Sequence, residues 1–120
     1  MIHKCKIVKI NDDQITVLIG DTEIIGFSNQ SVISDVGIET EVELEFYDDL
    51  IFSKSDSEKP YIERKGNSLS YLIVGKLNID EMKIQSIIDF SLEPEDLYDH
   101  GFMDGAMIQV DVLRINFEFR

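Results

Sequence analysis

The segment Glu41-Val42-Glu43-Leu44-Glu45-Phe46 alternates strictly between acidic and apolar residues. Successive side chains of a β-strand point to opposite faces of the sheet. The alternation therefore places three glutamates on one face and three apolar side chains on the other. This pattern predicts a half-buried antiparallel strand that faces solvent on one side and the core on the other.

Weaker alternation of the same period predicts three more strands before this segment. Residues 4–10 and 14–19 are joined by Asn-Asp-Asp, a typical turn sequence, and are expected to form the first hairpin. Residues 22–27 predict a third strand that pairs back on the second. Residues 28–38 mix turn-forming and apolar residues, and they fit either a loop or a single helical turn.

The second half of the chain continues the strand pattern with a different rhythm. Residues 50–52 predict either a short continuation of the preceding strand or a new strand. A polar loop at 53–60 follows, and residues 61–65 predict the next strand. Residues 70–77 form a nearly continuous apolar run, which predicts a strand buried on both faces at the centre of a sheet. Residues 81–90 fit the spacing of either a strand or a helix, and their β-branched isoleucines favour a strand.

The C-terminal region combines a long loop with a strand that changes face. Residues 91–105 have the composition of an ordered loop, with a helical turn expected at 94–97. In the final apolar run, the inward parity switches between Val112 and Ile115. A β-bulge near Leu113 would produce this switch and allow one strand to serve two sheets.

These elements predict an all-β or β-dominated fold of about eight strands, with at most one or two short helical turns. The expected architecture is a small antiparallel barrel or a sandwich. The chain has 120 residues, of which 43% are hydrophobic, so it is long enough for one core and too short for two. We therefore expect a single β-rich domain over residues 1–120.

The charge of the chain is strongly negative and unevenly distributed. Eleven basic and 24 acidic residues give a net charge of -13, and residues 11–58 contain thirteen acids and one base. A field of this sign repels nucleic acids and anionic membranes, and it accelerates encounter with a basic protein. The alternative interpretation is that the acidity only keeps a small protein soluble.

The cellular location is predicted from what the sequence lacks. The lone cysteine, Cys5, cannot form an intrachain disulfide bond, so folding does not require an oxidising compartment. The first residues lack the apolar stretch of a secretory signal, and no run approaches the roughly 18 apolar residues of a membrane span. We expect a cytoplasmic protein.

One loop contains side chains that could carry chemistry. Asp99, His100 and Asp104 are possible metal ligands or acid-base groups, although their spacing matches no calcium or zinc motif. Asp104 followed by Gly105 is equally typical of a tight turn before the last strand. Phosphate-binding, dinucleotide-binding and HExxH motifs are absent from the sequence. We therefore predict no catalytic residue, metal or cofactor, and a metal-assisted or acid-base enzyme at this loop is the alternative hypothesis.

The densest charge follows the alternating strand, and we call it the acidic ridge: Glu41, Glu43, Glu45, Asp48 and Asp49. Such a ridge is either a solvated sheet face or a docking surface for a lysine- or arginine-rich partner. The residues that could add aromatic anchors and one further acid to this surface are Phe46, Tyr47, Tyr98, Asp99 and Phe102.

The strand rhythm of residues 70–77, 87–90 and 107–117 resembles that of small bacterial immunity proteins, which neutralise toxin domains. No diagnostic motif accompanies this resemblance, so no binding residue follows from it. The resemblance implies a cytoplasmic inhibitor that occludes the active site of a cognate toxin, often a basic nuclease.

The sequence therefore predicts an acidic protein-binding domain, of the immunity or inhibitor type, that occludes a basic toxin or nuclease. Besides the enzyme hypothesis, a third hypothesis is an accessory β-domain of a larger assembly, in which the charge serves only solubility. The sequence leaves the oligomeric state open.

Overall fold

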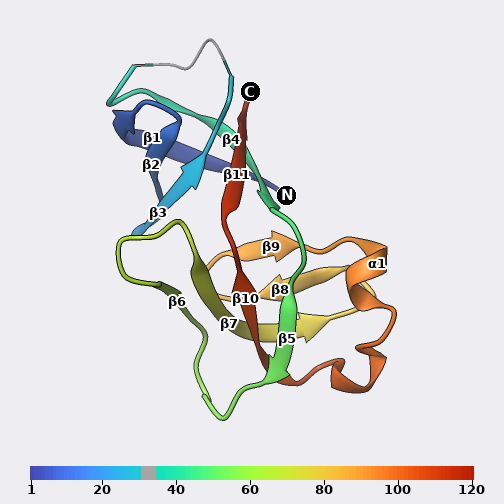
Figure 1. The fold of residues 1–120 in the computed structure, drawn as a ribbon. Helices are drawn as coiled ribbons and strands as arrows, with labels where there is room; N and C mark the ends of the chain where they lie inside the picture. The colour runs from blue at the N-terminus through green and yellow to red at the C-terminus, as the bar shows by residue number, and fades with distance from the viewer. Residues whose placement is uncertain (31–34) are drawn as a thin grey trace.

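The computed structural model describes residues 1–30 and 35–120, and β-strands dominate it (Figure 1). The described strands are β1 (Ile2–Asn11), β2 (Gln14–Ile19), β3 (Thr22–Phe27), β4 (Glu39–Phe46), β5 (Ile51–Lys54), β6 (Tyr61–Arg64), β7 (Tyr71–Asn78), β8 (Lys83–Gln85), β9 (Asp89–Ser91), β10 (Met107–Val112) and β11 (Ile115–Phe119). A short helix α1 (Pro94–Leu97) and a 3-10 turn η1 (Gly101–Met103) complete the fold. The predicted β-dominated class is confirmed, with eleven described strands where about eight were expected.

Five strands close into a barrel in the order β1-β2-β3-β11-β4, with β4 pairing back on β1. All neighbours are antiparallel except β3 and β11, which run parallel and share the single bridge Asn116–Phe27. A five-stranded Greek-key barrel with this connectivity has the architecture of the OB-fold. Fold alone assigns no activity, because the same architecture serves many functions.

The other six strands form a second sheet, which is inserted between the fourth and fifth strands of the barrel. Its order is β5-β10-β7-β8-β9, and β6 also pairs with β7. The predicted central strand is confirmed, because β7 pairs with β6, β8 and β10. In Figure 1 this sheet lies directly below the barrel, and the red C-terminal strand passes from one to the other.

The alternating segment forms β4 as predicted. Val42 and Leu44 are buried in the barrel, whereas Glu41 and Glu45 are exposed on its outer face. The first hairpin is also confirmed, with Asn11 opposite Gln14 and a left-handed Asp12 (φ 56°) in the turn. Asp tolerates this backbone conformation better than most residues.

The predicted change of face occurs at Leu113 and Arg114, but a break between two strands produces it in place of the expected β-bulge in one long strand. β10 belongs to the second sheet and β11 to the barrel, so one run of chain serves both sheets. Ile108, Val110 and Val112 are buried before the switch, and Ile115 and Phe117 are buried after it. Leu113 itself is exposed at the bend.

Two expectations need correction or qualification. Residues 81–90 form neither one strand nor a helix: two three-residue strands, β8 and β9, flank a turn in which Ile87 is exposed. The meander β7-β8-β9 folds back too tightly for a single long strand at this position. The helical turn at 94–97 is confirmed as α1. The loop or helical turn expected over 28–38 falls partly outside the described residues.

The barrel and the second sheet share one hydrophobic core. The buried cluster includes Ile7 and Ile24 of the barrel and Ile73, Leu77 and Phe90 of the second sheet. Two hydrogen bonds also join them. The backbone N–H of Ile25 donates to the Tyr71 hydroxyl at 2.9 Å, and His3 Nε2 lies 2.8 Å from the Asp89 carbonyl oxygen.

Within the described residues, no helix has the length and apolar character required to cross a membrane.

Candidate partner-binding surface

The acidic ridge has neighbours that neutralise its N-terminal part. Across the β1–β4 ladder, Lys4 is opposite Glu41 and Lys6 is opposite Glu39. The guanidinium of Arg120 forms an ion pair with Glu43. Opposite charges on paired strands attract each other, so the glutamates in this part of β4 help to hold the neighbouring segments together.

The C-terminal part of the ridge lacks such partners. Glu45 faces Asn116 across the β4–β11 ladder. None of the ion pairs formed within residues 1–30 and 35–120 involves Glu45, Asp48 or Asp49. The unneutralised negative charge therefore begins where β4 leaves the barrel.

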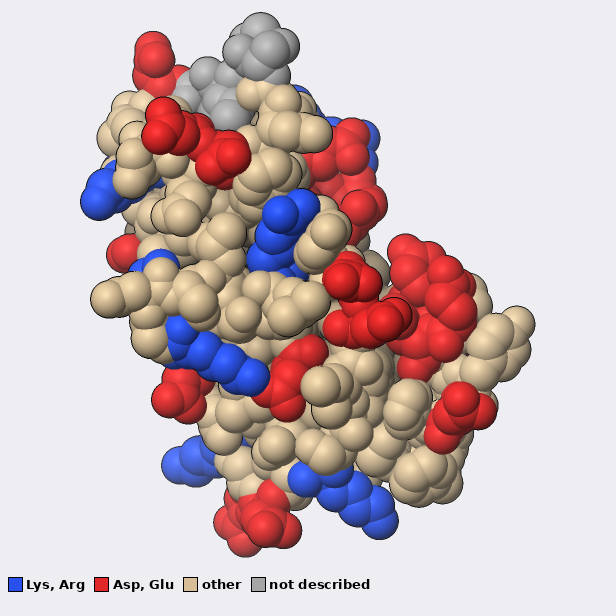
Figure 2. Space-filling view, in the orientation of Figure 1, with Lys and Arg blue, Asp and Glu red and all other residues tan. Residues whose placement is uncertain are grey.

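A second group of acids meets the ridge from a distant part of the sequence. A surface hollow of about 140 Å³, which we call the acidic cleft, is lined by Met1, Glu43, Leu44, Glu45, Phe46, Ser91, Glu93 and Asp96. Two carboxylates come from β4 and two from the start of α1. In Figure 2 the largest red area lies over α1 and the segment between β4 and β5. The fold thus brings together acidic side chains that lie about 50 residues apart in the sequence.

The acids of α1 also stabilise their own helix. Pro94 occupies the first turn, where its missing N–H costs nothing. Asp96 Oδ2 accepts the backbone N–H of Glu93 at 3.1 Å. Acidic side chains in this turn offset the positive end of the helix dipole. Buried Leu97 anchors the helix on the core, which fixes the carboxylates relative to β4.

The four aromatic residues predicted as anchors lie in different environments. Phe46 packs inward, with its ring centroid 5.0 Å from that of Phe90. Tyr47 is 41% exposed, and the guanidinium of Arg114 lies 3.8 Å from its ring centroid. Tyr98 and Phe102 are 82% and 76% exposed, with exposed Asp99 between them in sequence. Tyr98 and Phe102 are therefore the aromatic side chains most accessible to a partner.

Two polar residues of the loop named in the enzyme hypothesis, His100 and Asp104, form contacts within the fold, whereas Asp99 is exposed. His100 stacks on Phe52 with centroids 4.4 Å apart, and its Nδ1 lies 2.9 Å from the Asp96 carbonyl oxygen. Asp104 accepts the backbone N–H of Ile79 at 2.9 Å, and Gly105 takes the left-handed conformation of a turn (φ 78°). No group of three or more His, Cys, Asp or Glu side chains with the geometry of a metal site occurs in the described residues.

Sequence reasoning missed two residues at the parallel seam of the barrel. Gln30 clamps the end of β11: its Nε2 donates to the Phe119 carbonyl oxygen, and its Oε1 accepts the Phe119 N–H. Arg114 lies between the rings of Phe27 and Tyr47. Both residues line a hollow of about 350 Å³ together with Glu45 and Glu118. Neither residue stands out in any local pattern of the sequence.

Comparison with known proteins gives one match. Residues 1–120 match the sequence model of a family described as "Uncharacterised conserved protein UCP019853". No curated protein and no solved structure matches the chain.

Proposed function

The chain belongs to this family, and we propose from its acidic cleft that it is a protein-binding domain that docks a basic partner. The observation that supports the proposal is the convergence of Glu45 on β4 with Glu93 and Asp96 at α1. Glu43 lines the same cleft but is paired with Arg120. Residues about 50 positions apart supply one concentrated field. A concave acidic surface focuses that field and accelerates encounter with lysine- and arginine-rich surfaces.

The exposed aromatic residues support the same proposal. Tyr98 follows α1 directly and Phe102 lies in the next turn, η1, so both exposed rings belong to the segment that continues from the acidic helix. Exposed aromatic side chains next to complementary charge are typical of interface anchors. In the proposed mechanism, the carboxylates steer the partner and the two rings are buried when it docks.

The resemblance to immunity proteins suggests a particular kind of partner. A cytoplasmic inhibitor of this type would cover the active site of a basic toxin or nuclease. Such an active site binds phosphate groups through cations, and the acidic cleft would occupy those cations. This identification of the partner rests on the resemblance and remains a proposal.

The first test uses a fluorescent deca-arginine peptide and stopped-flow association at low and high salt. The variant Glu45→Lys/Glu93→Lys changes the cleft, and Asp56→Lys/Glu58→Lys makes the same change of charge at exposed positions of the β5–β6 loop. We expect the cleft variant to lower the association rate roughly fivefold more than the loop variant, and the difference to shrink at high salt. An equal decrease of the association rate in both variants would show that net charge causes the effect, and it would contradict a specific role of the acidic cleft.

The second test addresses the inhibitor proposal. The product of an adjacent gene with toxin or nuclease activity is assayed with increasing amounts of this protein. Inhibition that saturates near one equivalent, and weakens in the cleft variant, supports the proposal. If the toxin kept full activity at an excess of this protein, the protein would not be an inhibitor of that toxin. The acidic docking surface would still be tested separately by the deca-arginine experiment.

A further inference from the structure

A small basic hollow lies on the outer surface of the barrel, on elements other than those of the acidic cleft. It has a volume of about 160 Å³ and is lined by Lys9, Asn11, Gln14, Thr16, Ile25 and Arg64. Two cations and three uncharged polar side chains therefore surround it, without a carboxylate. In a chain with 24 acidic residues, this composition is distinctive.

The strand register explains why the barrel residues share this hollow. Lys9 is opposite Thr16 across the β1–β2 ladder, and Asn11 is opposite Gln14 two positions on. Thr16 is in turn opposite Ile25 on β3. Residues in these positions point to the same face of the sheet. Thr16 is only 7% exposed and is the only buried residue among those that line the hollow.

Arg64 reaches this face from β6 of the second sheet, and its own turn holds it in place. Its Nε donates to the Ser68 carbonyl oxygen at 2.7 Å, and its Nη2 donates to the Asn67 carbonyl oxygen at 2.9 Å. These bonds fix the plane of the guanidinium. None of the hydrogen bonds within the described part of the chain uses its Nη1.

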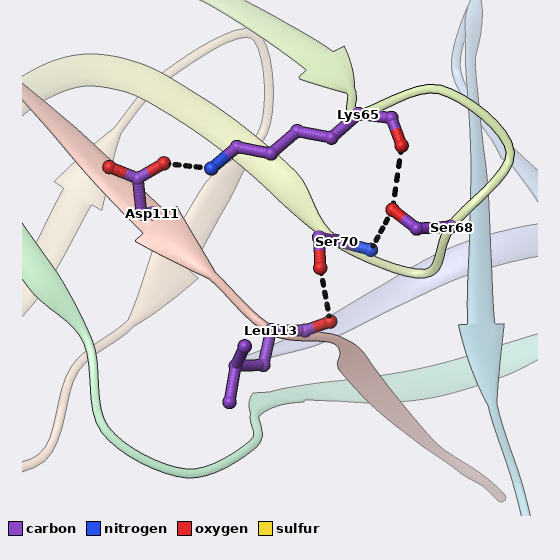
Figure 3. Close-up of polar contacts among 5 residues, drawn as sticks. All are labelled: Lys65, Ser68, Ser70, Asp111 and Leu113. Atoms are coloured by element: carbon purple, nitrogen blue, oxygen red, sulfur yellow. Dashed lines mark hydrogen bonds and ion pairs between the residues drawn. The ribbon is translucent and has the colours of Figure 1, made fainter.

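The turn that follows Arg64 is also fixed to the rest of the fold (Figure 3). Lys65 forms an ion pair with Asp111 on β10. Ser68 Oγ donates to the Lys65 carbonyl oxygen at 2.6 Å, and Ser70 Oγ donates to the Leu113 carbonyl oxygen at 3.0 Å. The guanidinium is therefore positioned before any ligand arrives, which reduces the entropy lost on binding.

We propose that this hollow binds a small phosphate-class oxyanion, either free phosphate or the phosphate group of a small phosphomonoester. The planar guanidinium of Arg64 and the ammonium of Lys9 supply charge-assisted donors, and the amides of Asn11 and Gln14 add neutral donors. Neither cation forms an ion pair with a carboxylate within residues 1–30 and 35–120. The site is independent of the proposed acidic docking function, because it uses β1, β2, β3 and β6.

The test is a titration of the intact protein with inorganic phosphate, followed by backbone amide chemical shifts at constant pH and ionic strength. We expect saturable shifts at Thr16 and Ile25. Lys9→Gln, which removes one cation without touching the β6–β7 turn, should raise the dissociation constant at least tenfold, as should Arg64→Gln. Lys54→Gln at the end of β5 and Lys59→Gln in the β5–β6 loop make the same change of charge and should leave the dissociation constant within about twofold.

Parallel titrations with glycerol 1-phosphate and acetate distinguish the ligand sources. Tighter binding of the phosphomonoester identifies a small organic phosphate, and equal binding identifies free phosphate. Acetate should bind at least tenfold more weakly than phosphate. Linear shifts without saturation, equal affinity for acetate, or an equal effect of the control variants would overturn the proposal. Retained amide dispersion in Lys9→Gln separates loss of the site from loss of the fold.

Discussion

The hydroxyl of Tyr71 on β7 accepts the backbone N–H of Ile25 on β3 at 2.9 Å. In the barrel, β11 reaches β3 only at Phe27, so the earlier part of that strand edge is left to other partners. A side chain of the second sheet thus satisfies a backbone donor of the barrel. The inserted sheet completes the barrel as well as packing on it, since Tyr71 itself is buried in the shared core.

Replacement of Tyr71 by phenylalanine tests this contact. Tyr71→Phe leaves the Ile25 N–H without an acceptor, and we expect a loss of about 1–2 kcal/mol in the free energy of unfolding. Urea denaturation followed by fluorescence or circular dichroism measures it. Tyr98→Phe is the matched control, because Tyr98 is 82% exposed and should change stability by less than about 0.5 kcal/mol. Equal stability of both variants would show that the bond contributes nothing.

The same residue predicts a loss of stability at alkaline pH. Burial raises the pKa of Tyr71 above its ordinary value of 10.0, and nearby Glu23 raises it further, while the Ile25 hydrogen bond and Arg64 oppose the shift. A raised pKa in the folded state means that ionisation favours unfolding. The contribution of the neutral hydroxyl is complete below pH 10 and decreases as pH rises toward the folded pKa.

The measurement compares the unfolding free energies of the wild type and Tyr71→Phe between pH 8 and pH 11. Other groups titrate in both proteins, so only the difference reports on Tyr71. We expect the advantage of the wild type to shrink above pH 10. A constant difference over the whole range would mean that Tyr71 does not ionise preferentially in the unfolded state.

Gly75 allows β7 to approach the chain that leaves β8. A Cβ atom at this position would lie 2.5 Å from the Gln85 carbonyl oxygen and 2.8 Å from its carbonyl carbon. Backbone atoms cannot move aside without breaking the β7–β8 ladder, so Gly75→Ala should lower the unfolding free energy by about 1–3 kcal/mol or more.

Gly101→Ala is the control for this prediction, because a Cβ there meets nothing within 4 Å and its φ is not left-handed. We expect this change to leave the protein as stable or slightly more stable. Thermal unfolding of the two variants side by side decides the prediction. If the Gly75→Ala protein were as stable as the wild type, the β7–β8 ladder could make room for the methyl group without a loss of stability.

Local periodicity predicted most of the individual strands. Alternation placed Val42 and Leu44 inside the barrel, and the parity change located the crossing at Leu113 between the two sheets. Both patterns arise from the side-chain period of a strand, which acts over neighbouring residues. The two strands within residues 81–91 have only three residues each, which is too short to show the alternation of a strand. The turn between β8 and β9 was therefore not predicted.

The pairing of distant segments could not be predicted in the same way. Glu93 and Asp96 join Glu45 at the acidic cleft only because the inserted sheet returns α1 to β4. The acidic ridge itself was visible in the sequence, but the two cations that neutralise part of it were not. Lys4 lies on β1, and Arg120 follows the end of β11. Arg64 likewise reaches Lys9 through tertiary structure alone. Single-sequence patterns carry no information on such contacts.

Arg114 provides the last prediction, because its guanidinium lies between two aromatic rings at the point where the chain passes from β10 to β11. The ring centroids of Phe27 and Tyr47 are 4.1 and 3.8 Å from its central carbon, and its Nε donates to Asn116 Oδ1 at 2.9 Å. Stacking on two faces requires a planar cation. Arg114→Lys keeps the charge and loses the plane, and Arg114→Gln loses both.

We expect Arg114→Gln to lower the unfolding free energy by about 1–2 kcal/mol, with Arg114→Lys recovering only part of the loss. A double-mutant cycle with Tyr47→Leu should give a coupling of about 0.5 kcal/mol or more. Lys76→Gln, an exposed change on β7, is the control. If the effects of the Arg114 and Tyr47 substitutions were additive, the stacking between the two side chains would contribute nothing to stability. A clear coupling would mean that Tyr47 is held rigidly beside Asp48, so that an aromatic ring next to the ridge loses little entropy when a partner covers it.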